Sequence, residues 1–204
     1  METQERILMK AHELFMRYGV RSVSMDEIAA HLGMSKKTIY QFYADKDALV
    51  EGVIGIEITN KEGECALCKT NCENAIHEIF LSIEGMQEML SSMNTSLVYD
   101  LEKYHPKAFK KLSKYKDEFL YDIIKDNLER GIQEELYKET INIEILTRFR
   151  LASVFLLFNP EIFPQTKYKL VTVVEEITDN FLYGLVTPKG QKMISKYKQQ
   201  RQTK

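Results

Sequence analysis

The chain has 204 residues, of which 44% are hydrophobic, so it is long enough to bury a core without disulfides or metal ions. A net charge of −2 gives no overall attraction to nucleic acid. Residues 1–50 are neutral, residues 51–187 carry 15 basic and 23 acidic side chains, and the last seventeen residues hold six basic side chains and no acidic one. Local charge therefore decides whether the chain binds an anionic partner.

The ends and the cysteines of the sequence indicate where the protein works. The segment after Met1 is polar, and the longest apolar run, residues 154–158, is far too short to cross a bilayer. The three cysteines lie together in residues 65–72, unlike the spaced framework of a secreted disulfide protein. We expect a cytoplasmic protein with no membrane partner.

Helical patterns begin at the N-terminus. No proline precedes Pro106, and Leu, Ile, Met, Glu and Lys dominate, which favours helix nearly throughout. A first helix is expected over residues 4–18, ended by Gly19 in a left-handed conformation. Ser24 stands three residues before Glu27 and opens an apolar-periodic run, a capping box that starts a second helix over residues 25–32.

The next segment predicts a helix-turn-helix in residues 24–43. Gly33 suits a tight turn, Ser35 can cap a third helix over residues 36–43, and the second helix of such a unit enters the DNA major groove. At 100° per residue, Ile39, Phe42 and Tyr43 fall on the packed side and Lys37 and Gln41 on the opposite side.

The exposed side of the third helix suits DNA. No acidic residue occurs between Leu32 and Ala44, so no carboxylate repels phosphate there. Gln41 can pair with adenine and Lys37 with guanine through base edges in the major groove.

The rest of the chain also reads as helix. A fourth helix begins near Asp45 and Asp47, whose charges complement its dipole, and continues toward the cysteines. Five more amphipathic helices are expected at about 74–93, 95–104, 107–130, 142–158 and 166–186. The sequence thus predicts an all-α fold of about nine helices.

At these positions the chain resembles the tetracycline-repressor (TetR) family. The resemblance covers about residues 4–54 and is carried by Gly19, by SMDEIA from Ser24, by GMSKKTIYQFY from Gly33 and by DKDAL from Asp45. It implies a homodimer with two N-terminal DNA-binding heads on a helical body, in which ligand binding changes the spacing of the heads. The domains it implies are a DNA-binding domain at 1–47, an effector-binding and dimerisation domain at 48–187, and a basic C-terminal tail at 188–204.

The resemblance also implies roles for single residues. Thr38, Tyr40 and Lys46 match positions that contact phosphate, and Lys37 and Gln41 match base-reading positions. Phe42 stands where many members have a Tyr or His able to reach phosphate, and Tyr43 where many have a buried Phe, so which ring reaches DNA stays open. The expected DNA-binding set is Ser24, Ser35, Lys36, Lys37, Thr38, Tyr40, Gln41, Tyr43 and Lys46.

Two further sets are expected in the body. Flexible thioethers and aromatic rings suit a pocket for a lipophilic effector, although at helical spacing they can equally be plain core. This pocket set is Met86, Met89, Met93, Tyr99, Tyr104, Phe109 and Phe119. Apolar stripes on the last two predicted helices suit a four-helix bundle across a two-fold axis, or an internal core. This dimer set is Phe149, Phe155, Val174, Ile177, Phe181 and Leu185.

Three features leave alternatives open. Cys65, Cys68 and Cys72 have helical spacing and fit plain packing, a zinc cluster completed by His77 or Glu64, or a redox-sensing thiol pair. The four histidines have no regular metal spacing, and no metal or cofactor is expected. The basic tail fits a solvated terminus or a contact with DNA phosphate or another acidic partner.

The leading function is ligand-responsive repression, in which the free dimer binds an inverted-repeat double-stranded DNA operator and a small lipophilic ligand releases it. The alternative is a DNA-binding regulator without a small-molecule effector, gated by a protein partner or constitutive. An enzyme is not expected, because the sequence has no Ser-His-Asp or Cys-His constellation, no phosphate-cradling glycine loop and no motif-spaced metal ligands.

Overall fold

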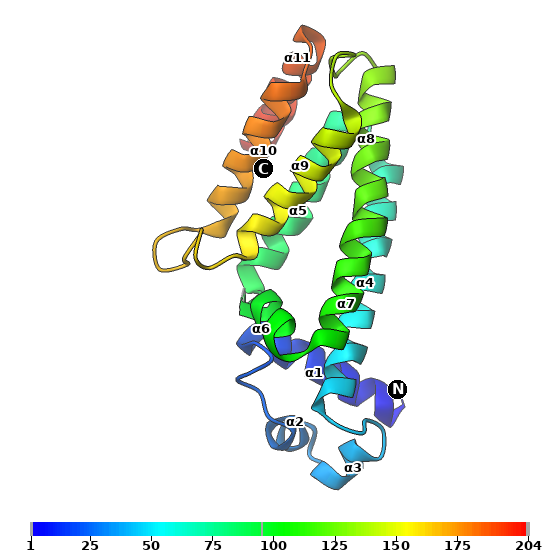
Figure 1. Cartoon of the computed structure of the whole chain (residues 1–204), viewed down its shortest axis with the longest axis vertical. Helices are drawn as coiled ribbons and strands as arrows, with labels where there is room; N and C mark the ends of the chain where they lie inside the picture. The colour runs from blue at the N-terminus through cyan, green and yellow to red at the C-terminus, as the bar shows by residue number, and fades with distance from the viewer. Residues whose placement is uncertain (1, 95, 203–204) are drawn as a thin grey trace. The chain divides into compact units, whose positions relative to one another are not determined.

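The computed structural model describes residues 2–94 and 96–202 and is helical almost throughout (Figure 1). Thr95, at the start of the expected helix 95–104, and residues 203–204 of the basic tail lie outside the described residues. The helices are α1 (Thr3–Tyr18), α2 (Met25–Leu32), α3 (Lys36–Tyr40), α4 (Lys46–Asn71), α5 (Ala75–Ser92), α6 (Ser96–Tyr104), α7 (Pro106–Lys114), the π-helical η1 (Tyr115–Leu120), α8 (Tyr121–Gln133), α9 (Ile143–Phe155), the 3₁₀-helical η2 (Leu156–Phe158), α10 (Leu170–Leu185) and α11 (Pro188–Gln202).

The all-α fold class is confirmed. Residues 2–94 and 96–202 contain no β-strand, and one isolated bridge joins Tyr137 to Val186. No helix in those residues is both long enough and apolar enough to span a bilayer. The expected helix 107–130 corresponds to α7, η1 and α8 in direct succession, whereas α10 begins later than the expected residue 166 because Lys167 and Tyr168 instead form a turn on the Pro164 carbonyl.

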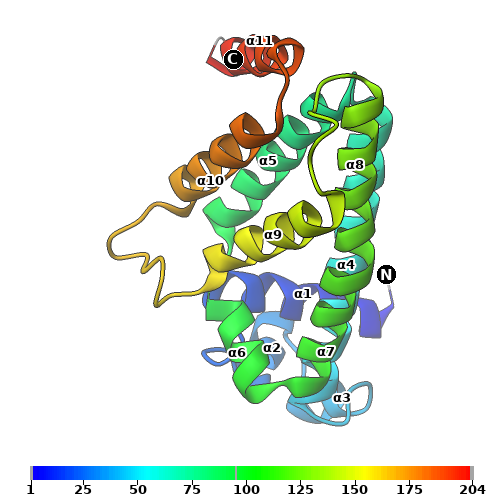
Figure 2. The same ribbon diagram turned by 45° about the horizontal axis from the view of Figure 1, so that its top comes forward.

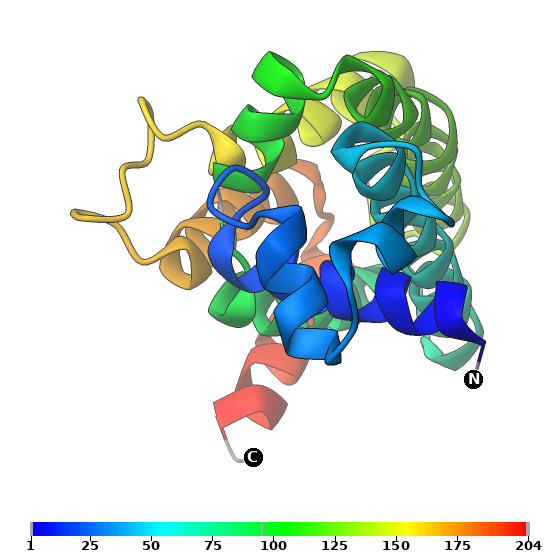
Figure 3. The same cartoon turned by 90° about the horizontal axis from the view of Figure 1, so that it is seen from below.

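The first of two compact units comprises Met1–Lys61 and Leu90–Tyr115. Within it, α2 packs against both α1 and α3 (Figure 3, shades of blue). Its core is apolar and brings together residues far apart in the sequence, among them Ile7, Phe15, Ile28, Ile39, Leu49 and Leu101. Helix α3 has only five residues, so this shared core, rather than its own hydrogen bonds, holds it in place.

The second unit comprises Glu62–Met89 and Lys116–Lys204. Helix α9 packs against α8 and α10, and Figure 2 shows it between them. Buried residues of this unit include Phe80, Leu128, Tyr137, Phe181 and Leu182. The division after residue 47 that the family resemblance implies is a functional one and stays a prediction.

The C-terminal segment differs from the expected solvated tail. Residues 188–202 form α11, whose Tyr197 is buried and stacks on the His77 ring at 4.6 Å between centroids. Lys196 pairs with Glu73 at 3.0 Å, and Lys198 pairs with Asp179. Because Ile194 and Tyr197 are buried in the core of this unit, and acidic residues pair with the lysines, the basic segment folds onto the unit instead of extending into solvent.

Candidate nucleic-acid interface

The start of α2 is fixed by the capping box that the sequence predicts. The Ser24 hydroxyl accepts the Glu27 amide at 3.2 Å, and the Glu27 carboxylate accepts the Ser24 amide at 2.6 Å. These reciprocal bonds satisfy two backbone donors that a helix N-terminus otherwise leaves without acceptors. The expected role of Ser24 as the N-cap is therefore confirmed.

The turn between α2 and α3 depends on one glycine. Gly33 has φ 65° and ψ 31°, the left-handed conformation that L side chains rarely adopt. The Gly33 amide donates to the Ala30 carbonyl and the Met34 amide to the Ala29 carbonyl, both at 3.1 Å, which is a Schellman motif. The Ser35 hydroxyl then accepts the Thr38 amide at 3.1 Å and caps α3. Residues 33–35 thus connect the two helices in a tight turn.

The outer side of α3 carries polar groups that are free to bind a ligand. Lys37, Tyr40 and Gln41 are exposed. The side chains of Lys37 and Gln41 have no hydrogen-bond or ion-pair partner among residues 2–94 and 96–202. Gln41 keeps helical angles, φ −70° and ψ −24°, so it stands one turn after Lys37 on the same side. These two side chains form an exposed, unpartnered polar pair on one side of the helix.

The neighbouring polar residues of α3 already have partners. The Thr38 hydroxyl lies 2.8 Å from the Ser35 hydroxyl, and Lys36 pairs with Asp26 of α2 at 2.7 Å. This pairing raises the pKa of Lys36, first through the Asp26 hydrogen bond and then through the Asp26 charge. Exposed ion pairs are weak and screened by salt, so phosphate can replace Asp26 as the partner of Lys36.

Of the two rings after α3, Tyr43 packs as the helical periodicity predicts and Phe42 does not. Tyr43 is only 7% exposed and belongs to the core, whereas Phe42, expected to pack, is 41% exposed. Helix α3 ends at Tyr40 rather than at the expected residue 43, so the helical periodicity that placed Phe42 on the packed side does not extend to it. The ring of Tyr43 is thus a packing element rather than a surface for DNA.

Lys46 contacts the protein's own backbone instead of extending toward phosphate as the family resemblance implies. Its Nζ donates to the Val20 carbonyl at 2.7 Å and lies 5.9 Å from the centre of the Phe15 ring. Desolvation by these neighbours lowers the pKa of Lys46, although nearby carboxylates oppose the shift. Lys46 therefore links the loop after α1 to the start of α4, and a phosphate contact requires its amino group to leave the Val20 oxygen.

Comparisons with known proteins agree with this geometry. Residues 7–53 match the family model for bacterial regulatory proteins of the tetR family. The uncharacterized HTH-type transcriptional regulator YvaF of Bacillus subtilis (strain 168) is 27% identical over 183 residues, which are 89% of this chain and 94% of that protein. Residues 7–53 therefore belong to the tetR family of bacterial regulatory proteins. The chain is a DNA-binding transcriptional regulator.

Solved structures show that the likeness of fold extends beyond the matched segment. A TetR-family transcriptional regulator from Agrobacterium tumefaciens has a TM-score of 0.74 at 17% identity, covering 90% of this chain and 97% of that one. The transcriptional regulator FadR from Bacillus subtilis, in complex with stearoyl-CoA, has a TM-score of 0.66 at 15% identity, covering 88% and 98%. At these identities the match concerns the fold alone.

The expected effector-pocket residues of this TetR-family regulator do not all have the burial of a pocket lining. Met86, Met89, Phe109 and Phe119 are partly buried, as is Met93. Tyr99 and Tyr104 are instead exposed, and the Lys103 amino group lies 5.5 and 5.4 Å from their ring centres. Because α6 packs its Leu97 and Leu101 inward, these two rings fall on its outer side. The pocket itself stays a prediction.

The expected dimer residues divide into two groups. Val174, Phe181 and Leu185 are buried within the single chain because they form the inner face of α10, so they are not a free surface for a second copy. Phe155 and Ile177 are partly buried. Phe149 on α9 is 57% exposed and is the member of the set that lies on the surface.

Helix α9 of this regulator has its polarity reversed. Its exposed side carries Ile145, 63% exposed, and Phe149, while its buried side carries Thr147, Arg150 and Ser153 together with one apolar residue, Leu151. Sequence periodicity missed Arg150 and Ile145, because it assigns apolar residues to the inside. The arginine placed between Phe149 and Leu151 was the available signal, since Arg is almost never buried without a reason.

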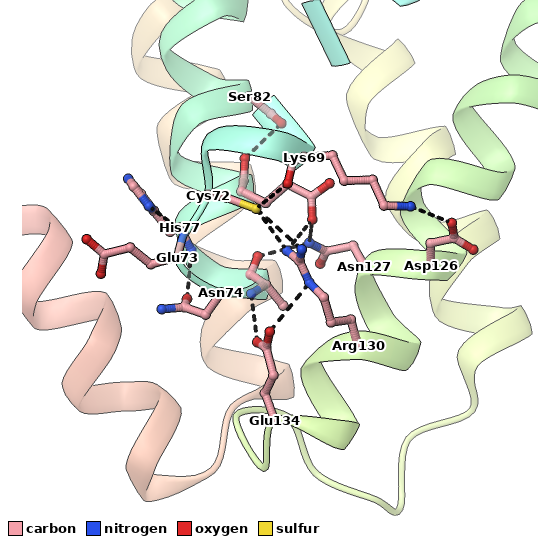
Figure 4. Close-up of polar contacts among 12 residues, drawn as sticks. Lys69, Cys72, Glu73, Asn74, His77, Ser82, Asp126, Asn127, Arg130 and Glu134 are labelled. Carbon is pink, nitrogen blue, oxygen red and sulfur yellow. Dashed lines mark hydrogen bonds and ion pairs between the residues drawn. The ribbon is translucent and has the colours of Figure 1, made fainter. Parts of the chain in front are cut away.

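The cysteine region belongs to a polar network in the second unit (Figure 4). Both terminal nitrogens of Arg130 lie 3.3 Å from the Cys72 sulfur, and one lies 2.6 Å from the buried Glu78 carboxylate. Asn127 donates to Glu78 at 2.7 Å and accepts from the Tyr137 hydroxyl at 3.2 Å. Within residues 2–94 and 96–202, no group of three or more His, Cys, Asp or Glu side chains is arranged to hold a metal ion.

Proposed function

We propose that this regulator is a homodimeric repressor that binds an inverted-repeat operator through α3 and is released from it by a small molecule bound in the second unit. The observation that carries the DNA-binding part is the exposed pair Lys37 and Gln41 on a short helix fixed between two caps. In this arrangement α3 lies in the major groove, and the caps keep its angle to α2 constant.

The proposed contacts divide by what they recognise. Lys37 and Gln41 contact base edges, where Lys suits guanine and Gln suits adenine. Lys36, Thr38 and Tyr40 contact phosphate and position α3 without reading sequence. Ser24 and Ser35 act through the caps that they form.

Dimerisation is proposed through the outer side of α9. An exposed apolar stripe on an otherwise well-packed domain marks an interaction surface. Ile145 and Phe149 lie on this side one turn apart, and the exposed Leu156 follows them at the first residue of η2. A two-fold axis there brings two copies of the same stripe together and places two heads on half-sites about one DNA turn, ~34 Å, apart.

Operator binding tests the proposal directly. The full-length protein is titrated at two salt concentrations into a fluorescent duplex from the region upstream of its own gene, with a scrambled duplex beside it. We expect saturable binding of two protomers per site, at least tenfold tighter than to scrambled DNA. Equal binding to both duplexes over the whole upstream region would contradict the proposal.

A matched pair of variants assigns the binding to α3. Lys37→Ala should weaken operator binding by about 1–3 kcal/mol, whereas Lys125→Ala, which removes an exposed lysine from α8 in the second unit, should leave it unchanged. If both variants bind the operator as the wild type does, α3 is not the reading helix.

A further inference from the structure

Arg150 is a buried cation that has few hydrogen-bond partners in the protein. It lies on the inner side of α9 and is 8% exposed. One terminal nitrogen donates to the Thr178 hydroxyl at 3.0 Å, and the other is buried with no hydrogen-bond partner. Its guanidinium carbon lies 5.1 Å from the centre of the Phe181 ring. A guanidinium has five N–H donors, so most of its hydrogen-bonding capacity here lacks a described protein acceptor.

The same unit contains an arginine whose charge is paired, although its Nε is also buried without a hydrogen bond among the described residues, so the contrast concerns the charge. Arg130 lies 2.6 Å from the Glu78 carboxylate and 3.6 Å from that of Glu134. No carboxylate of the described residues pairs with Arg150: burial lowers its pKa to about 10, and the Tyr137 hydroxyl opposes this shift. Arg150 is therefore still charged at neutral pH. Burying an unpaired charge is costly, and a charged partner would remove most of that cost.

The hydroxyl that contacts Arg150 keeps an unused donor. The Thr178 hydroxyl is fully buried and accepts from Arg150, but its own hydrogen has no acceptor among the residues that the structure describes. Thr147 and Ser153, by contrast, donate to carbonyls of α9 at 2.8 Å. A carboxylate offers two oxygens, one for the free Arg150 nitrogen and one for the Thr178 hydroxyl.

The remaining surroundings are apolar. Val174 and Phe181 are buried on the same face of α10 as Thr178, four residues before it and three after it. A ligand that places a carboxylate at Arg150 therefore meets hydrocarbon and an aromatic ring beside its charged end.

We propose that Arg150 and Thr178 bind the carboxylate of a small, otherwise apolar acid, and that this acid is the effector. Only the second half of this inference rests on the proposed function; the binding site stands on the contacts of Arg150. Packing connects the site to the surface of the unit, because the Phe181 ring under Arg150 stacks on Phe149, the exposed ring of α9, at 6.4 Å. An acid that pairs with Arg150 changes the packing of Phe181 and, through it, of Phe149.

The test compares acids with neutral molecules of the same size. Octanoate, decanoate, dodecanoate and benzoate are titrated calorimetrically into the full-length protein, with decanol, benzyl alcohol and inorganic phosphate beside them. We expect at least one carboxylate to bind at least tenfold more tightly than its alcohol, and phosphate not to bind. Binding of none of the four acids, or equal binding of acid and alcohol, would overturn the inference.

Variants then test whether the acid binds at Arg150. Arg150→Met should weaken acid binding about 30-fold or more, because it removes the charged partner of a buried pair, and Arg150→Lys should retain part of it. Arg148→Met is the matched control: Arg148 lies two residues away on the same helix, exposed and 3.5 Å from Glu144, and its loss should change nothing. Unchanged acid binding by Arg150→Met would refute the site. If Arg150→Met fails to fold, Arg150→Lys tests the site instead. An ammonium has a different shape from a guanidinium, so wild-type affinity of this variant for the acid would also refute the site.

Operator binding separates this inference from the proposed function. The acid should release wild-type protein from the operator but not Arg150→Met, which should bind the operator normally without acid. If the acid binds through Arg150 and leaves operator binding unchanged, the site stands and its role as effector site is wrong. If the protein binds no operator at all, the proposed function fails while the calorimetric result still decides the site.

Discussion

Gln41 offers the sharpest residue-level test of how α3 reads DNA. Its exposed, unpartnered amide can form two hydrogen bonds with one adenine, so Gln41→Ala should cost about 1–3 kcal/mol of binding energy on the preferred operator. On operators with that base pair replaced, the loss should be small. The measurement is a set of Kd values on operators substituted one base pair at a time. Tyr40→Phe, which loses only a hydroxyl, should weaken all operators alike, and the same uniform loss for Gln41→Ala would remove Gln41 from base recognition.

A second residue-level prediction concerns pH and the pair His12–Glu57, whose Nε2 and Oε2 atoms lie 2.7 Å apart in the first unit. Burial raises the pKa of Glu57, but the His12 hydrogen bond and the charges of His12 and Lys61 outweigh it, and the pKa ends below its usual 4.5. The native carboxylate therefore holds its proton less tightly than the unfolded chain does. The stabilisation is present above pH 4.5 and is lost as the pH falls below it.

Glu57→Gln removes this effect. At pH 6 the variant should have a free energy of unfolding about 1.5 kcal/mol lower than the wild type, and the difference should shrink as the pH falls toward 3. Urea unfolding at a series of pH values measures it. Glu102→Gln, at an exposed position of α6, should show no such trend. A Glu57→Gln difference that stays constant down to pH 3 would contradict the assignment.

At the scale of elements, the turn between α2 and α3 was predictable because its determinants are local. Ser24 with Glu27, Gly33 and Ser35 act over three residues, and each has the predicted cap or conformation. The boundary of α3 and the exposure of Phe42 were not predictable, because they depend on a core assembled from distant segments. The burial of Arg150 was not predictable for the same reason. Packing against α8 and α10 decides which face of α9 is buried, and the apolar residues in the sequence of α9 indicate the opposite face.

The turn gives a prediction at this scale. Gly33→Ala should destabilise the protein by about 1 kcal/mol, because a Cβ at φ 65° strains the backbone even though no atom lies within 4 Å of it. Gly55→Ala is the control of opposite sign. Gly55 also has open space around it but lies inside α4, where alanine should stabilise by up to about 1 kcal/mol. Chemical denaturation of both variants measures the difference, and equal signs would show that the left-handed conformation is not what Gly33 provides.

At the scale of the whole molecule, operator recognition depends on how many copies of the chain act together. One α3 contacts few base pairs, so a single head binds weakly, and a second linked head raises the affinity through its effective concentration, by about 10²-fold or more. The reversed polarity of α9 is costly in a monomer, since Ile145 and Phe149 face water while Arg150 is buried. Association of two copies through α9 would cover the apolar side and leave the buried side to a ligand.

Phe149→Glu tests this arrangement. Because Phe149 is 57% exposed, the variant should fold, but two charges facing each other across the two-fold axis should separate the copies. Light scattering should show a change from twice 23.9 kDa to 23.9 kDa, together with an operator affinity at least ~100-fold lower. Leu67→Glu, at an apolar side chain of α4 that is 62% exposed, should remain dimeric. If Phe149→Glu remains a dimer with intact operator binding, the interface lies elsewhere. The contacts from Arg150 through Phe181 to Phe149 would then not lead to the dimer interface.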